Sequence, residues 1–135
     1  MIVESIESIP TTPQDIFNHV ATHLLTQNEV CMVDYDCKYH HNGKACAAGC
    51  LIPDSLYSED DEGYDFFDMR YLNGSILAYN NLRTRGFPEL SLESLNLISR
   101  LQNLHDNLPI EQWKSNLRKI AEEFNLNTSC LNYHD

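Results

Sequence analysis

Three stretches of the chain carry apolar residues at intervals of three and four, and this periodicity most narrowly limits the possible fold. They cover residues 12–27, 91–108 and 110–125. Such spacing places apolar side chains on one face of an α-helix. Thr12 and Ser91 are good N-caps for the first two stretches, Pro13 suits a first helical position, and Pro109 separates the last two. The pattern predicts three amphipathic helices, with a further short helix or turn near residues 75–82.

The segment from Cys31 to Pro53 has a different pattern. Apolar and polar residues alternate from Cys31 to Tyr39, which is the period of a β-strand. Asn42-Gly43 follows, and this pair favours a tight hairpin because both residues tolerate positive φ. We expect a β-hairpin whose return arm turns into helix near Cys46, and Gly49 indicates a close approach of backbones.

These elements fit one domain, since the chain has 135 residues and 42% of them are hydrophobic. The sequence therefore predicts an α+β, mainly α, small single domain of about four helices with one β-hairpin. Residues 1–11 are expected to form an N-terminal arm, residues 12–126 the globular domain, and residues 127–135 a flexible tail.

The charge balance restricts the partners of the chain. Nine Lys and Arg stand against 20 Asp and Glu, a net charge of −11. Direct nucleic-acid binding and attachment to an anionic membrane both need a basic surface, so neither is expected. An acidic protein is instead steered towards a protein partner with a basic surface. The candidate partner-binding residues lie in a segment without Lys or Arg: Asp54, Glu59, Asp60, Asp61, Glu62, Asp65 and Asp68. The alternative interpretation is that this segment is only a solvated surface loop.

Calcium and membrane chemistry find little support in the sequence. Placing Gly63 at the sixth position of an EF-hand loop puts Met69 at the twelfth, where a glutamate is required. No apolar run reaches the roughly 18 residues of a membrane span, and the first residues lack the basic and apolar regions of a secretory signal. With five cysteines, an odd number, we expect reduced thiols and a cytoplasmic protein.

The cysteines and histidines of the hairpin segment are candidate metal ligands. Cys37, His40, Cys46 and Cys50 lie within 14 residues around a tight turn, with His41 as a substitute for His40. Zn²⁺ takes four sulfur or nitrogen ligands in a tetrahedron, so a structural zinc site is one interpretation. The other is that the cysteines are small core residues. His19 and His23, one turn apart on the first helix, are interpreted as boundary residues.

A thiol enzyme is a further hypothesis. Cys46 is its candidate nucleophile, and His105 with Asp106 its candidate base and orienting carboxylate. The alternative is that His105 and Asp106 stabilise the end of their helix. No phosphate-binding or dinucleotide-binding glycine motif is present, so no nucleotide cofactor is expected.

A set of short motifs is spread over the chain: Thr12–Phe17, His23–Gln27, Cys37–Tyr39, Asn42-Gly43, Cys46–Asp54, Glu62-Gly63, and Leu101–Asp106 before Trp113. Together these motifs resemble a widespread group of small uncharacterised proteins of tailed phages and prophages. The resemblance covers most of residues 12–126. It implies a phage context, with residence in the host-cell cytoplasm, and carries no catalytic assignment. The group has Cys-x-Tyr-Arg-Gly where this chain has Cys37–His41, which does not support a shared histidine ligand. The matching residues are expected to form one packed cluster, with the hairpin docked on the last two helices: Cys37, Tyr39, Cys46, Gly49, His105, Asp106 and Trp113.

The leading functional hypothesis is a small acidic accessory protein that binds a host or phage protein without catalysis, for example as an inhibitor. The alternatives are an enzyme or small-ligand binder with a site where Cys37, Cys46 and His105 converge, a structural zinc domain, and an assembly component. The sequence leaves the oligomeric state open.

Overall fold

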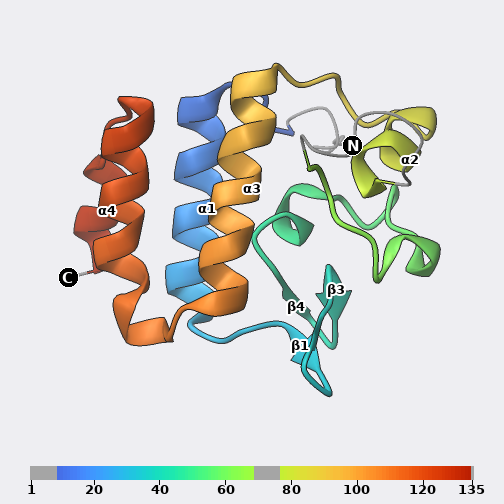
Figure 1. Ribbon diagram of the computed structural model, residues 1–135, viewed down its shortest axis with the longest axis horizontal. Helices are drawn as coiled ribbons and strands as arrows, with labels where there is room; N and C mark the ends of the chain where they lie inside the picture. The colour runs from blue at the N-terminus through green and yellow to red at the C-terminus, as the bar shows by residue number, and fades with distance from the viewer. Residues whose placement is uncertain (1–8, 69–76, 135) are drawn as a thin grey trace, which may run out of the picture.

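Helices α1 (Pro13–Gln27), α3 (Leu92–Asn107) and α4 (Trp113–Phe124) each pack against the other two and form a three-helix bundle (Figure 1). The computed structural model describes residues 9–68 and 77–134. Helices α1 and α3 run in the same direction and α4 returns beside them (Figure 1). The predicted α+β, mainly α class with four helices is confirmed, the fourth being α2 (Ala78–Thr84). Residues 1–8 of the predicted N-terminal arm, and residues 75–76 of the helix or turn predicted near residues 75–82, lie outside the described residues.

The helix ends follow the expected chemistry. The Thr12 side chain accepts a hydrogen bond from the Asp15 amide at 3.2 Å, and Ser91 accepts one from Ser94 at 3.1 Å. Asn28 and Asn125, with φ of 53° and 59°, end α1 and α4 in the left-handed conformation that asparagine tolerates. One turn of 3₁₀ helix, η5 (Ile110–Gln112), precedes α4 after Pro109. The three predicted amphipathic helices are therefore confirmed, close to the predicted bounds.

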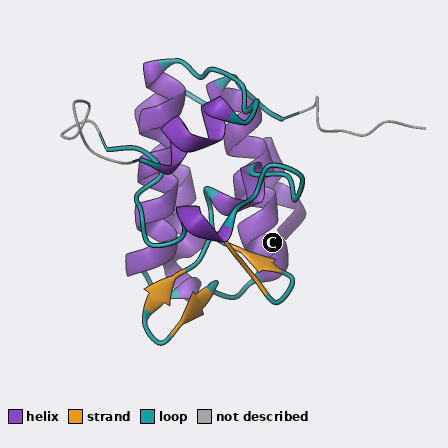
Figure 2. Cartoon of the chain, turned by 90° about the vertical axis from the view of Figure 1, so that its right-hand side faces the viewer, coloured by secondary structure: helices purple, strands orange, loops and turns teal. Residues whose placement is uncertain are grey.

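The hairpin segment contains two small hairpins rather than one. Strands β3 (His40–His41) and β4 (Lys44–Ala45) pair across Asn42-Gly43, as predicted. Strands β1 (Met32–Val33) and β2 (Asp36–Cys37) pair across a second turn, at Asp34 and Tyr35. This turn divides the continuous strand expected between Cys31 and Tyr39. Figure 2 shows the strands gathered at one end of the helices.

After β4 the chain enters a short 3₁₀ helix, η2 (Gly49–Leu51), in agreement with the expected change from strand to helix. A Cβ atom on Gly49 would lie 2.0 Å from the Tyr39 carbonyl oxygen, so the predicted close backbone approach is confirmed. A further 3₁₀ turn, η3 (Glu59–Asp61), lies in the acidic segment. Among the described residues, no helix is long and apolar enough to cross a membrane.

The end of the chain corrects the predicted domain bounds. In place of a flexible tail, residues after Asn127 form η6 (Ser129–His134), which packs against α1. Leu131 is fully buried in the common core. Gln14 of α1 donates to the Asn127 carbonyl at 3.1 Å and accepts from the Asn127 amide at 2.8 Å. The globular domain therefore extends past residue 126.

Candidate functional site

The hairpins are attached to α3 by hydrogen bonds around His105. The Cys31 amide donates to His105 Nε2 at 3.0 Å, and the Lys38 amide donates to the Cys31 carbonyl at 2.9 Å. The His105 ring stacks on Trp113, with the ring centroids 5.8 Å apart. The expectation that this segment docks on the last two helices is confirmed for α3, at His105. Its described hydrogen bonds to a second helix go to α1 rather than α4.

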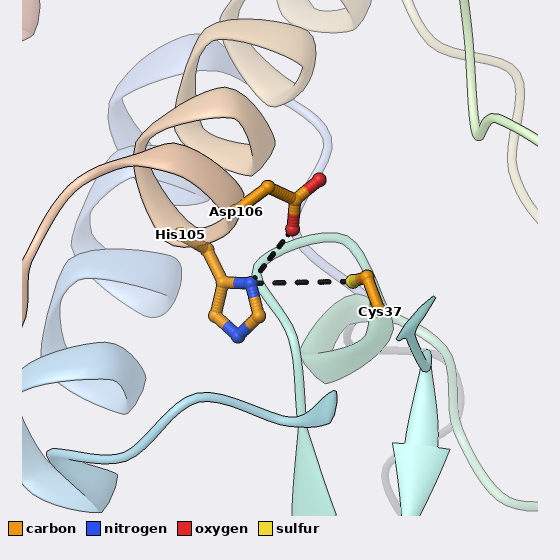
Figure 3. Close-up of side chains that lie close together, drawn as sticks. All are labelled: Cys37, His105 and Asp106. Carbon is orange, nitrogen blue, oxygen red and sulfur yellow. Dashed lines mark hydrogen bonds and ion pairs between the residues drawn. The ribbon is translucent and has the colours of Figure 1, made fainter. Parts of the chain in front are cut away.

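A polar network surrounds the same histidine (Figure 3). His105 Nδ1 lies 2.9 Å from Asp106 Oδ1 and 4.0 Å from Cys37 Sγ. Gln102 donates to Asp106 Oδ1 at 2.8 Å and to Cys37 Sγ at 3.2 Å, and it accepts from the Ala48 amide at 2.8 Å. The network therefore joins α3 to the first hairpin at Cys37 and to the segment after β4 at Ala48.

The hydrogen bonds of His105 fix which ring nitrogen carries the proton. A backbone amide only donates, so the bond from Cys31 requires an unprotonated Nε2. The proton of the neutral ring is then on Nδ1, which donates to Asp106. Burial lowers the pKa of His105, while its contacts with Asp106 and Cys37 raise it, to about 9. The Cys31 amide opposes that rise, because a protonated Nε2 accepts no hydrogen bond, and the described geometry is that of the neutral ring.

This geometry differs from that of an activated thiol. Cys46, the predicted nucleophile, is fully buried and accepts a hydrogen bond from the Gly49 amide at 3.3 Å. Cys37 takes the place beside His105, but neither ring nitrogen is available to it as a base. Contact with Cys46 and burial raise the pKa of the Cys37 thiol. The thiol therefore stays protonated, whereas the nucleophile of such enzymes is the thiolate.

The four predicted metal ligands do not form one site: Cys37 and Cys46 are in contact, but His40 and Cys50 make hydrogen bonds elsewhere. His40 bonds the Gly49 carbonyl through Nε2 at 2.8 Å and stacks on Tyr57, while Cys50 donates to the Ala47 carbonyl at 3.2 Å. His41 is exposed at the end of β3. Over the described part of the chain, the grouping with metal-ligand spacing is Cys37, His105 and Asp106, whose ligand atoms lie within 4.8 Å of one another. All five cysteines are free thiols.

Two histidines of α1, His19 and His23, hold β4 and the segment after it against the helix, and His40 of β3 bonds the same segment. His19, His23 and His40 each bring Nε2 to a backbone carbonyl, of Cys50, Ala45 and Gly49 respectively, at 2.8–3.0 Å. Gln27 adds two hydrogen bonds to Ala45, at 2.9 and 3.0 Å. His19 and His23, interpreted from sequence as boundary residues, therefore position the hairpins.

The acidic segment separates into structural and exposed residues. Asp61 is buried and pairs with Arg85, and Glu62 accepts hydrogen bonds from the Tyr39 and His40 amides at 2.8 and 3.3 Å. These two carboxylates are occupied within the fold and are removed from the predicted partner-binding set. Asp68 is half-buried. The members that face solvent are Asp54, Glu59, Asp60 and Asp65.

The turn between β1 and β2 carries the most exposed large apolar residue described. Tyr35 is 99% exposed. Its φ is 71°, and the φ of Asp34 directly before it is 52°. Asp34 and Asp36 are also exposed. Sequence reasoning missed this turn, because it placed Tyr35 in the middle of a strand.

Comparisons of the chain with family models, with curated proteins and with solved structures found no match.

Proposed function

We propose that the protein is an acidic binding module, of the phage accessory type, that docks on a basic surface of a host or phage protein in the host-cell cytoplasm. The observation that carries this proposal is the exposed Tyr35 at the tip of the first hairpin. We call Asp34, Tyr35 and Asp36 the acidic tip.

Backbone energetics support a role for the tip beyond folding. A left-handed conformation costs an L-residue roughly 1–2 kcal/mol, and such turns usually carry glycine or asparagine. Here both central positions, Asp34 and Tyr35, have positive φ. A side chain that is 99% exposed returns almost no packing energy within the fold. Strain of this kind is typical of residues retained for a functional contact.

The base of the hairpin supports rigid presentation of the tip. Cys37, directly after Asp36, is held by Gln102, and Cys31, directly before β1, is held by His105. A rigid aromatic anchor loses little entropy on binding, and aromatic residues are enriched at the centres of interfaces. The net charge of −11 supplies attraction towards a cationic partner.

The experiment crosslinks the partner through the tip. A photoreactive phenylalanine replaces Tyr35, and in the matched control it replaces Leu92, which is 50% exposed at the start of α3. The protein crosslinked only from position 35 is identified by mass spectrometry, purified, and titrated calorimetrically at low and high salt. We expect a basic partner whose affinity falls as salt rises.

Two tip variants then decide the proposal. We expect Tyr35→Gly to weaken the purified complex at least tenfold while its stability stays level or rises, because glycine relieves the positive φ. Tyr35→Phe should keep most of the affinity. Equal affinity of Tyr35→Gly and the parent protein would overturn the proposal.

A structural zinc ion is the second candidate function. Sulfur, nitrogen and oxygen ligands within 4.8 Å at Cys37, His105 and Asp106 support it, since Zn²⁺ accepts all three. Metal at Nδ1 would move the ring proton to Nε2 and displace the Cys31 hydrogen bond, which favours the binding module instead. The test is elemental analysis of protein purified without chelators. Stoichiometric zinc that Cys37→Ser removes would support the zinc site, and its absence from both proteins would exclude it.

A further inference from the structure

A small cavity lies directly beside the acidic tip and shares Asp36 with it. Its volume is about 340 Å³, within the range of pockets that bind small ligands. Residues from the first hairpin, the loop after η3 and helix α3 line it together. The lining residues that the argument uses are Asp36, Lys38, Tyr64, Asp65, Phe66 and Asp106.

The lining combines negative charge with aromatic surface. Asp36 and Asp65 are exposed carboxylates at the cavity, and Lys38 is the single basic residue among those that line it. Tyr64 is 44% exposed, and Phe66, which also lines the cavity, is buried. Carboxylates beside aromatic faces suit an organic cation, because the cation pairs with the former and stacks on the latter.

Asp106 provides a carboxylate whose position is already fixed. Hydrogen bonds from His105 and Gln102 both end on Oδ1, at 2.9 and 2.8 Å. The second carboxylate oxygen points away from His105 and Cys37 (Figure 3). Both neighbours come from α3, so the carboxylate is held in one position before any ligand binds. A fixed, ionised acceptor loses little freedom when a cation binds.

We propose that this cavity receives one guanidinium group, from an arginine side chain of the basic partner. This proposal rests on the proposed function, and it adds the identity of the partner side chain that enters the cavity. A guanidinium is planar, stacks on an aromatic face, and directs several N–H donors to carboxylates in one plane. An ammonium offers a hydrated point charge without a stacking face, so the cavity should prefer arginine to lysine.

The probe is N-acetyl-arginine amide, titrated into ¹⁵N-labelled protein and followed by amide chemical shifts, with N-acetyl-lysine amide as the matched comparison. We expect saturable shifts around residues 64–66 and 106, with at least threefold weaker binding of the lysine compound. Absence of saturation, equal binding of both compounds, or shifts centred away from these residues would overturn the proposal.

Variants locate the site and separate loss of binding from loss of folding. Asp106→Asn and Tyr64→Ala should each weaken the arginine compound at least threefold. Tyr64 is 44% exposed, and its backbone carbonyl accepts from the Tyr39 hydroxyl at 2.5 Å. Tyr64→Ala keeps this backbone bond, so the variant should stay folded. Asp54→Asn is the control, because Asp54 is exposed but lies outside this cavity. Equal losses in Asp54→Asn would contradict the assignment.

The outcomes distinguish this inference from the function on which it rests. Failure of the arginine compound, with Tyr35→Gly still weakening the partner complex, would overturn the guanidinium site and leave the binding module in place. Failure of both experiments would overturn both.

Discussion

Among the described glycines, Gly49 is the one that a larger residue could least easily replace, because it lies so close to Tyr39. Because a Cβ there would lie 2.0 Å from a backbone oxygen, the two chain segments would have to separate. We expect Gly49→Ala to lower the free energy of unfolding by about 3 kcal/mol, the upper part of the usual range for overpacking. Urea denaturation followed by circular dichroism measures the change.

Gly63→Ala is the matched control for that variant. Gly63 has φ of 88° and nothing within 4 Å of its added Cβ. Its substitution should cost only the backbone strain, about 1 kcal/mol. Equal losses in the two variants would show that the Tyr39 contact does not constrain residue 49.

The Asp106 carboxylate makes stability depend on pH in one direction. Its pKa is lowered in the folded protein, so its contribution is present above the usual carboxyl pKa and is lost as pH falls through the folded value. Asp106→Asn keeps the shape and removes the charge. We expect a loss of about 1 kcal/mol at pH 7 that shrinks as pH falls towards 3. Urea unfolding at several pH values tests this, and a pH-independent difference would contradict it.

The helix ends are the features that this sequence predicts most directly. Thr12, Pro13 and Ser91 act through neighbours within one turn, so their roles follow from local chemistry alone. The Asn42-Gly43 turn can be predicted for the same reason. The turn at Asp34 and Tyr35 carries no such signal, because a tyrosine rarely adopts positive φ. It depends on contacts from Cys31 and Cys37 to a helix far along the chain.

The cap of α1 offers a test at the level of one element. Thr12→Ala removes the acceptor for the Asp15 amide and leaves one orphaned donor at the helix start. We expect a loss of about 1 kcal/mol in the free energy of unfolding. Thr12→Ser retains the hydroxyl and should restore most of it. Thermal unfolding of the three proteins compares them, and an unchanged Thr12→Ala would contradict a capping role.

At the scale of the whole molecule, the spacing of residues along the sequence does not predict the candidate site. Cys37 and His105 are separated by 68 positions, and a hairpin and the end of α3 bring them together. The local ligand set Cys37, His40, Cys46 and Cys50 was more visible in the sequence and was wrong, because backbone carbonyls and amides occupy three of the four. The hypothesis of a site where Cys37, Cys46 and His105 converge came closer, because Cys37 contacts both other residues.

The chain end that the sequence marked as a tail contributes to the core. Leu131 is fully buried, and η6 contacts α1. We expect Leu131→Ala to cost about 2–4 kcal/mol, as for other large-to-small core substitutions. Asn132→Ala, at the exposed neighbouring position, should change little. Chemical denaturation compares the two, and a neutral Leu131→Ala would show that the segment is dispensable.

The packing of α1 also has a consequence for the biosynthesis of the protein. Of the elements that pack against this helix, η2 comes from the first half of the chain, whereas α3, α4 and η6 come from the second half. These last three are synthesised late. On the ribosome, which makes the N-terminus first, α1 emerges well before any of them. The part of its apolar face that α3, α4 and η6 cover therefore remains exposed, and available to chaperones, until translation is nearly complete.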